Sequence, residues 1–420
     1  MNAVSREAAQ RAVERAARTA YGRLVAHLAA RSRDIAAAED ALGDALVAAM
    51  RTWPCDGVPE KPEAWLLTAA RNALTDAGRH RRVVAASEPE LLLLHGSAQA
   101  AFDASEIPDE RLKLLFVCTH PAITPALRAP LMLQAVLGLD AARIAPAFLV
   151  SPAAMSQRLV RAKARIREAG ARFDPPAPQE LPQRLDAVLE AIYAAFGLGW
   201  EAAADAPCAA GLEPTLAEEA LWIARDLQNL LPEEPETLGL LALLLHCHAR
   251  CAARRSPEGA YVPLAEQDTR LWDQPMMAEA ERLLARAHSF ERPGRFQLEA
   301  AIQSAHAERA RSGRTEWAAI ARFYEQLVRL APSAGARTAH AAATAEAAGP
   351  ATGLAHLDAI PADAAAGYQP YWAVRGHLLG RLGRLEEARS AYDLAIGLSQ
   401  DSAVREHLRS KRDALARHDR

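Results

Sequence analysis

The stretch LDAARIAPAFLVSPAAMSQRLVRAKARIREAG, residues 139–170, predicts two helices joined by a tight turn. Asp140 is placed to cap a short first helix, and Ser151 followed by Pro152 is a typical start for the second. Proline removes a backbone hydrogen bond, so Pro146 should bend the first helix. The apolar residues of the second helix are spaced four, three and four apart, which predicts a buried stripe of Met155, Leu159, Ala162 and Ile166.

The side of this second helix that faces away from the stripe is basic. Residues 151–172 hold six basic residues against one acid, Glu168. The outer face is predicted to carry Gln157, Arg158, Arg161 and Arg165. A helix-turn-helix with a basic free side has the geometry and charge of a DNA reader. The alternative is a helical hairpin with a solvated basic face.

Composition predicts an all-α protein of several domains. The chain has 420 residues, half of them apolar, with few aromatic residues and abundant alanine. Its net charge of −3 divides into +5 for residues 1–172 and −8 for the remainder, so the first part suits a polyanionic partner. The five cysteines have no framework spacing, which indicates a reducing compartment. We find no signal peptide or long apolar run, and therefore expect a cytoplasmic protein without a membrane partner.

Two further helices are predicted between Arg33 and Arg82. The first has an apolar stripe through Ile35, Ala38, Leu42, Leu46 and Met50, and its opposite side is acidic. That acidic side carries Asp34, Glu39, Asp40 and Asp44. The second helix opens at Pro62 and ends in a basic run. Its outward residues are predicted to be Arg71, Asn72, Thr75, Asp76 and Arg79.

Together these blocks resemble a known family. AEDALGDALVAAMRTWP and AWLLTAARNALTDAGRHRR resemble the core-binding and promoter-melting helices of bacterial RNA polymerase sigma factors of the extracytoplasmic-function group. IAPAFLVSPAAMSQRLVRAKARIRE resembles the terminal helix-turn-helix of the same group. Gly43 departs from the pattern, because the family usually has a longer polar residue there.

The resemblance implies two partners, core RNA polymerase and promoter DNA, and a role for each helix. Polymerase would contact Asp34, Glu39, Asp40 and Asp44. The unstacked minus-ten bases would be captured by Arg71, Asn72, Asp76, Arg79, Arg81 and Arg82. The minus-thirty-five duplex would be read at base edges by Ser156, Gln157, Arg158 and Arg161, with Lys163, Arg165 and Arg167 on phosphates. Trp53 is interpreted as a core residue, although it could also line the base pocket.

The C-terminal part extends well beyond a compact sigma factor. It contains LLALLLHCHAR and EQDTRLWD blocks that resemble those of a sigma subgroup with a long helical extension. Where that subgroup has an Asn-Glu-Gly-Tyr block, this chain has Gly197, Leu198, Gly199 and Trp200. His246, Cys247, His248 and Cys251 suggest a metal site, but their spacing favours packing, and we expect no metal or other cofactor.

The last part of the chain shows a repeat of 34 residues, the tetratricopeptide (TPR) period, in the spacing of Gly349 and Gly383 and of Ala342 and Gly376. Ala388 and Ala395 bracket Tyr392 as such a repeat requires. The middle unit is irregular, with Asp358 at an aromatic position and Pro361 inside its second helix. Stacked helix pairs form a groove for peptides or for the protein's own domains; the alternative is a purely structural helical cap.

We therefore expect an all-α transcription initiation factor with no catalytic activity, since neither a phosphate-binding glycine loop nor a credible nucleophile–base pair is present. The predicted segments are a sigma region 2-like domain at 1–86, a linker at 87–110, a sigma region 4-like domain at 111–172, a proline-rich linker at 173–182, a helical middle domain at 183–290 and TPR-like repeats at 291–420. The alternatives are a DNA-binding regulator that never engages polymerase and a TPR scaffold with a vestigial first part.

The opposite charges of the two parts suggest an intramolecular role for the extension. The first part has a charge of +5 and the second −8, and a short tether raises their effective concentration to the millimolar range. Residues 181–420 are expected to modulate the sigma domains, either by bracing them at promoter spacing or by masking their basic helices. We favour bracing, because the extension is longer and more apolar-faced than a mask requires.

Overall fold

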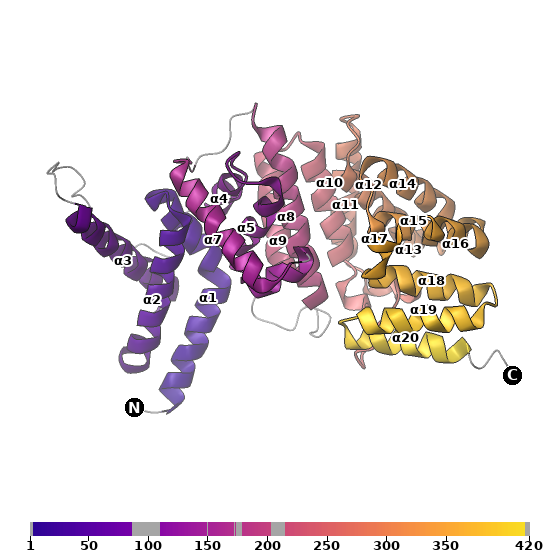
Figure 1. The fold of residues 1–420 in the computed structure, drawn as a ribbon, viewed down its shortest axis with the longest axis horizontal. Helices are drawn as coiled ribbons and strands as arrows, with labels where there is room; N and C mark the ends of the chain where they lie inside the picture. The colour runs from indigo at the N-terminus through magenta and orange to yellow at the C-terminus, as the bar shows by residue number, and fades with distance from the viewer. Residues whose placement is uncertain are drawn as a thin grey trace. The chain divides into compact units, whose positions relative to one another are not determined.

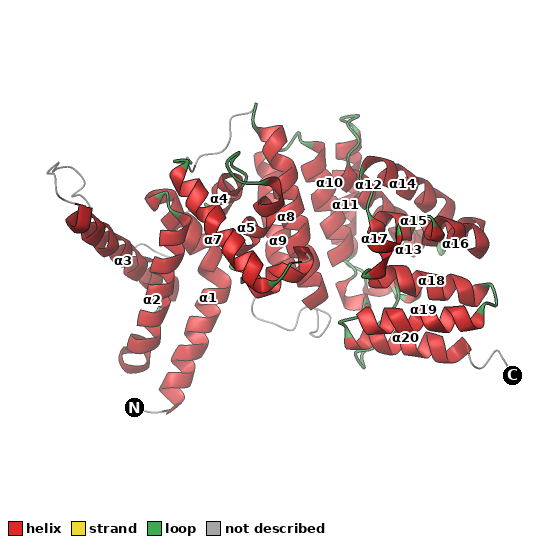
Figure 2. Ribbon diagram, in the orientation of Figure 1, coloured by secondary structure: helices red, strands yellow, loops and turns green. Residues whose placement is uncertain are grey.

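The computed structural model describes residues 3–85, 110–148, 150–171, 173, 179–202 and 215–415. Within these ranges the chain is helical and has no strand, which confirms the predicted all-α class (Figure 2). The chain forms two compact units, residues 1–195 and 196–420 (Figure 1). None of the described helices has the length and apolarity to span a membrane.

The first unit begins with three packed helices, α1 (Ala3–Ser32), α2 (Ile35–Asp56) and α3 (Pro62–Ala85). Asp34 starts α2 by accepting the backbone N–H of Ala37 at 3.1 Å. Trp53 is 2% exposed and meets Trp65 edge-on, with ring centroids 5.5 Å apart. Trp53 is thus a core residue, as its sequence context predicts.

The first unit continues with α4 (Arg111–Cys118), α5 (Pro125–Leu137), α6 (Ala141–Ile144), the 3-10 turn η2 (Ala145–Phe148) and α7 (Pro152–Glu168). Among these helices, α4 and α5 pack against α1, α7 packs against α2, and α6 packs against α5 and α7. Gly138 ends α5 in the left-handed conformation, with φ of 67°. The α-helix stops at Ile144, and Pro146 lies in the 3-10 turn, in agreement with the predicted bend.

Helix α8 (Leu181–Ala202) contains the boundary between the two units. The second unit continues with α9 (Leu216–Leu230), α10 (Pro235–His248), α11 (Gln274–His288) and α12 (Arg295–Ala307). Every residue of α10 from Pro235 to His246 apart from Glu236 is buried, which explains its nearly continuous apolar sequence.

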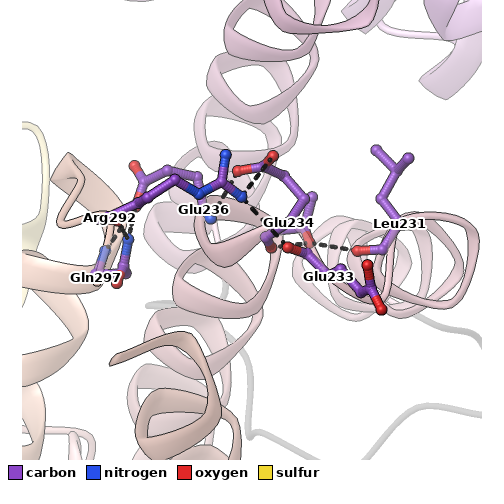
Figure 3. A network of polar contacts seen from close by, with 7 residues as sticks. Leu231, Glu233, Glu234, Glu236, Arg292 and Gln297 are labelled. Atoms are coloured by element: carbon purple, nitrogen blue, oxygen red, sulfur yellow. Dashed lines mark hydrogen bonds and ion pairs between the residues drawn. The ribbon is translucent and has the colours of Figure 1, made fainter. Parts of the chain in front are cut away.

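The junction between α10 and α12 is a network of polar contacts (Figure 3). The Glu236 carboxylate accepts the backbone N–H groups of Phe296 and Gln297 at 2.9 and 3.2 Å, and so caps α12 from another helix. Gly294 leaves room for it, since a Cβ there would lie 2.1 Å from the Glu236 carboxyl carbon. Arg292 reaches back to the Glu233 carbonyl and the Glu234 carboxylate. Glu236 therefore has a structural role.

The remaining helices are α13 (Arg309–Ser312), α14 (Trp317–Leu330), α15 (Ala334–Ala348), α16 (Pro350–Asp358), α17 (Ala362–Ala366), α18 (Gln369–Arg381), α19 (Leu385–Leu398) and α20 (Ser402–Leu415). Gly349 and Gly383 lie at the turns inside the α15–α16 and α18–α19 hairpins, with φ of 97° and 75°. A Cβ on Gly376 would lie 3.0 Å from the Tyr392 ring, so glycine permits close packing. These positions match the predicted repeat, and the TPR assignment itself stays a prediction.

The irregular middle unit differs from the prediction in one detail. Pro361 does not lie inside a helix, because α16 already ends at Asp358 and Pro361 precedes α17. Asp358, which replaces the expected aromatic residue, forms an ion pair with Arg375 of α18. The shortened helix α16 is thus linked to the α18–α19 hairpin by this ion pair.

Candidate functional site

Helix α7 is built as its sequence predicts. The Ser151 hydroxyl accepts the backbone N–H of Ala154 at 3.3 Å, and Pro152 occupies the first position. Asp140 similarly accepts the N–H of Arg143 at 2.8 Å and starts α6. The predicted apolar stripe of α7 is buried, and consists of Met155, Leu159, Ala162 and Ile166. Because this stripe is buried, the opposite side of α7 faces solvent.

The free side of α7 presents polar and cationic groups to solvent. The exposed candidates for duplex contact are Ser156, Gln157, Arg158, Arg161 and Arg165. Val160 lies among them with 62% of its surface exposed. Amide, hydroxyl and guanidinium groups along one helix can hydrogen-bond to base edges, and an apolar group can contact a thymine methyl.

Lys163 and Arg167 lie on the side of α7 that faces α2. The Lys163 ammonium forms an ion pair with Glu39, and the two side chains are only 9% and 14% exposed. Arg167 lies 3.6 Å from the Asp34 carboxylate, and Asp34 itself is 9% exposed. These two basic residues, expected on phosphates, thus contact two acids expected on polymerase. The sequence contains no signal for this pairing, because the partners are far apart along the chain.

Helix α2 presents two acids and two apolar side chains on one exposed side. Asp40 and Asp44 are exposed as predicted. Val47 and Met50 lie beside them, with 46% and 57% of their surfaces exposed. Gly43 also lies on this side, and a Cβ there would meet nothing within 4 Å. The surface is defined by Asp40, Asp44, Val47 and Met50 and is called the α2 face below.

The predicted apolar stripe of α2 is wrong at its C-terminal end. Met50 is exposed, and the buried side instead runs through Ala41, Ala45, Ala49 and Trp53. Three of these four buried residues are alanine, whose small side chain permits close approach of a neighbouring helix. A prediction that gives Leu and Met more weight than Ala therefore assigns the wrong side of the helix to the core at this end.

Helix α3 exposes part of the set predicted to capture single-stranded bases. Asn72 and Asp76 are exposed. Arg71 differs from its predicted outward position, because its guanidinium hydrogen-bonds the Nε2 of His27 in α1 at 2.7 Å. Burial and the Arg71 charge lower the pKa of His27, which favours the neutral ring that can accept this bond. Arg79, Arg81 and Arg82 belong to the helix, but their side chains lie outside the described residues.

The polar segment from Glu266 to Asp273 makes local structural contacts in the second unit. Gln267 and Trp272 are buried, and Asp273 caps α11 by accepting the N–H of Met276 at 2.9 Å. Arg309 donates to the Leu264, Ala265 and Gln267 carbonyls and lies 5.3 Å from the Trp272 ring centroid. The density of functional groups noted in the sequence therefore serves caps and loop closure.

The departure at residues 197–200 also has a packing explanation. A Cβ on Gly199 would lie 2.3 Å from the Ala217 backbone nitrogen, so only glycine lets α8 approach the start of α9. The Trp200 ring supports the Arg254 guanidinium at 3.8 Å, and Arg254 donates to the Trp200 carbonyl at 2.8 Å.

Comparison with known proteins places these elements in a class. Residues 17–83, which cover most of α1 to α3, match the sigma-70 region 2 family. Residues 184–288 match a family of unknown function, DUF6596. The chain is 39% identical over 389 residues, 91% of each chain, to an uncharacterized protein of Rhizobium meliloti (strain 1021). No solved structure matches it.

The first three helices thus form a sigma-70 region 2 domain. This domain supports a role as a sigma factor and implies binding to core RNA polymerase and promoter DNA. The chain as a whole belongs to the family of the rhizobial protein, with which it shares nearly its full length.

Proposed function

We propose that the protein is a sigma factor of the extracytoplasmic-function group, which binds core RNA polymerase and directs it to promoters without catalytic activity of its own. The observation that carries the proposal is the α2 face inside the sigma-70 region 2 match. Exposed Val47 and Met50 offer apolar area for a protein partner, and Asp40 and Asp44 beside them supply charge that guides the encounter.

Promoter contact is divided between α3 and α7. Asn72 and Asp76 on α3 are exposed for hydrogen bonds to unstacked minus-ten bases. The basic run Arg79–Arg82 belongs to the same helix, and its cationic residue types suit contacts with the DNA backbone. Gln157, Arg158 and Arg161 on α7 are exposed for base edges of the minus-thirty-five duplex.

The C-terminal helices modulate this activity through TPR-like hairpins that bind a peptide or the sigma domains themselves. The support is the pair of hairpins with glycine turns one repeat period apart, at Gly349 and Gly383. Helix pairs stacked in this way build extended surfaces for proteins.

The test combines the full-length protein with core RNA polymerase from a related bacterium. Bound promoter DNA is sequenced, and run-off transcription is measured on the recovered sequences. We expect retention on the polymerase and transcripts that start downstream of a shared two-part motif. Binding to DNA without retention on polymerase would instead identify a DNA-binding regulator that works apart from it.

A further inference from the structure

A cavity of about 200 Å³ lies in the second unit, bordered by α12 to α15 and by the 3-10 turn η5 (Leu264–Glu266). Arg309 fixes η5 beside the cavity, because its guanidinium donates to the Leu264 and Ala265 carbonyls at 2.9 and 2.7 Å. The turn belongs to the residues that match DUF6596, whereas α14 and α15 lie beyond that match. The cavity wall is therefore formed jointly by two parts of the chain.

Small apolar side chains give the cavity its room. On the α15 side the wall consists of Ala339, Ala342 and Ala343. An apolar cavity of about 150 Å³ is large enough to bind benzene. A cavity of about 200 Å³ therefore accommodates one aromatic ring with a few further atoms.

Aromatic side chains form another part of the wall. The rings of His306 in α12 and Trp317 in α14 lie edge-on, with their centroids 5.4 Å apart and their planes at 80°. Tyr324, further along α14, also lines the cavity. Aromatic rings favour edge-on and offset contacts with one another. The wall therefore suits a ligand that is itself an aromatic ring.

Two of these side chains carry polar groups that lack a hydrogen-bond partner. Among the described residues, neither the Tyr324 hydroxyl nor the His306 ring forms a hydrogen bond. Burial lowers the pKa of His306 to about 4, with further effects from the Arg250 and Arg309 charges, and burial raises the pKa of Tyr324. Both groups are therefore neutral at pH 7, and a polar atom of a ligand would restore a hydrogen bond that burial has removed.

The charge in the cavity wall is already engaged. Among the described residues that line the cavity, Arg309 alone is charged at pH 7. Its guanidinium donates to three backbone carbonyls, those of Leu264, Ala265 and Gln267. An ion would lose its hydration shell here without gaining a counter-ion, which costs far more than the burial of a neutral molecule. The cavity therefore selects against charged ligands.

We propose that this cavity binds a small neutral aromatic molecule that carries a hydroxyl group, of the phenol class. The ring of the ligand lies against Trp317 and Ala342, and its hydroxyl group forms a hydrogen bond with the Tyr324 hydroxyl. Because the ligand contacts η5 as well as α14 and α15, it links the DUF6596 match to the TPR-like hairpins. The site goes beyond the proposed function, and binding is measured on the protein alone, without polymerase or DNA.

The test uses isothermal titration calorimetry of the full-length protein at pH 7.5 with three probes, p-cresol, toluene and 4-hydroxybenzoate. We expect p-cresol to bind at one site. Toluene has the same ring and methyl group without the hydroxyl, and should bind about 3-fold to 10-fold more weakly for the loss of one hydrogen bond. 4-Hydroxybenzoate replaces the methyl group by a carboxylate, and should bind weaker than p-cresol by about 10-fold or more.

Tyr324→Phe removes the hydroxyl group and keeps the ring. It should weaken p-cresol by about 3-fold to 10-fold and leave toluene unchanged. The matched control is Tyr392→Phe in α19, a tyrosine that occurs two repeat periods later and does not line the cavity. The control should bind both probes as the wild type does. An equal loss for p-cresol and toluene in Tyr324→Phe would contradict the hydrogen bond.

Ala342→Leu fills the cavity with three further carbon atoms and should abolish binding of p-cresol. Its control is Ala347→Leu on the same helix, at an exposed position outside the cavity, which should bind normally. Circular dichroism melting establishes that each variant is folded, and Tyr324→Phe still decides the proposal if Ala342→Leu is not. Binding of p-cresol that is absent in the wild type, or unchanged in a folded Ala342→Leu variant, would overturn the site.

A fourth probe separates a free ligand from a peptide side chain of the same chemistry. N-acetyltyrosinamide carries the phenol ring on a peptide backbone that one ring's volume cannot enclose. We expect it to bind more weakly than p-cresol. Tighter binding would overturn the free ligand in favour of a tyrosine side chain from a partner protein. Failure of the proposed function is recognised separately, as absence of promoter-directed transcription by the wild type at saturating polymerase.

Discussion

At the scale of single residues, the second unit contains a histidine whose ring is almost fully buried. His246 is 1% exposed, and neither ring nitrogen has a hydrogen-bond partner. Burial, with a further effect from the Arg250 charge, lowers its pKa to about 4. The ring is therefore neutral at pH 7, so its 3.4 Å approach to Glu281 is not an ion pair at that pH.

This histidine predicts a loss of stability in acid. Between about pH 6.5 and 4 the unfolded ring binds a proton that the folded ring does not, so the free energy of unfolding falls as the pH drops through this window. Between pH 7.5 and 5 the expected loss from His246 is about 2 kcal/mol. Urea unfolding of the full-length protein at several pH values measures it, and His246→Leu should flatten the profile by this amount. Parallel profiles for the two proteins would contradict the prediction.

At the scale of elements, α2 and α7 each combine a buried stripe with a chemically distinct free side. The two free sides can therefore be altered without disturbing the core, and each should affect one partner only. Exposed substitutions usually change stability by less than about 0.5 kcal/mol.

On α2, reversing Asp40 and Asp44 to lysine should leave the protein folded and weaken its capture of core polymerase. Transcription should fall, and added salt should change the residual capture little, because the guiding charges are already gone. Co-sedimentation with polymerase at two salt concentrations measures this, and Arg161→Ala serves as a control that should keep full capture. Capture at the wild-type level would show that the α2 face is ordinary solvated surface.

On α7, Arg158→Ala and Arg165→Ala should have different effects on DNA binding, one on sequence specificity and the other on overall affinity. Loss of a base-edge contact at Arg158 should cost about 1–3 kcal/mol at one promoter position and relax specificity there. Loss of a phosphate contact at Arg165 should weaken all sequences alike and lower the salt slope by about 1. Binding to a promoter library at several salt concentrations separates the two effects. Variants with the wild-type sequence profile and slope would place α7 outside the groove.

At the scale of the whole molecule, the chain consists of two compact units whose boundary lies within α8. The two ends also differ in charge, since residues 1–172 carry +5 and the rest −8. Bracing and masking by the extension remain distinct hypotheses, and they predict opposite effects of its removal.

Truncation after Phe173 should abolish promoter-specific transcription and leave DNA affinity little changed if the extension braces the sigma domains. Masking would instead increase both quantities. A second truncation after Ala202 keeps α8 and separates the loss of this helix from the loss of the second unit. Run-off transcription and promoter binding of both truncated proteins distinguish bracing from masking. Wild-type behaviour in both assays would indicate that the extension acts on another partner.

The sequence by itself determined the helix starts and buried helix sides that depend on residues close together in the chain. Ser151 with Pro152 starts α7, Asp140 starts α6, and the spacing of Met155, Leu159 and Ile166 sets the buried side of α7. A cap or a helical stripe depends on residues within one or two turns, so its signal is present in a short stretch of chain. The same locality made the exposed candidates Gln157, Arg158 and Arg161 predictable.

Only the tertiary structure decided which charges meet. Lys163 lies 124 residues from Glu39 along the chain, and Arg71 lies 44 residues from His27. No periodicity links such positions, so a basic residue on a helix flank looks the same whether it faces solvent or a carboxylate. Met50 is exposed although it continues the apolar spacing of α2, because the buried side of that helix runs through Ala41, Ala45, Ala49 and Trp53. Partner choice depends on the packing of distant helices, which exists only once the chain is folded.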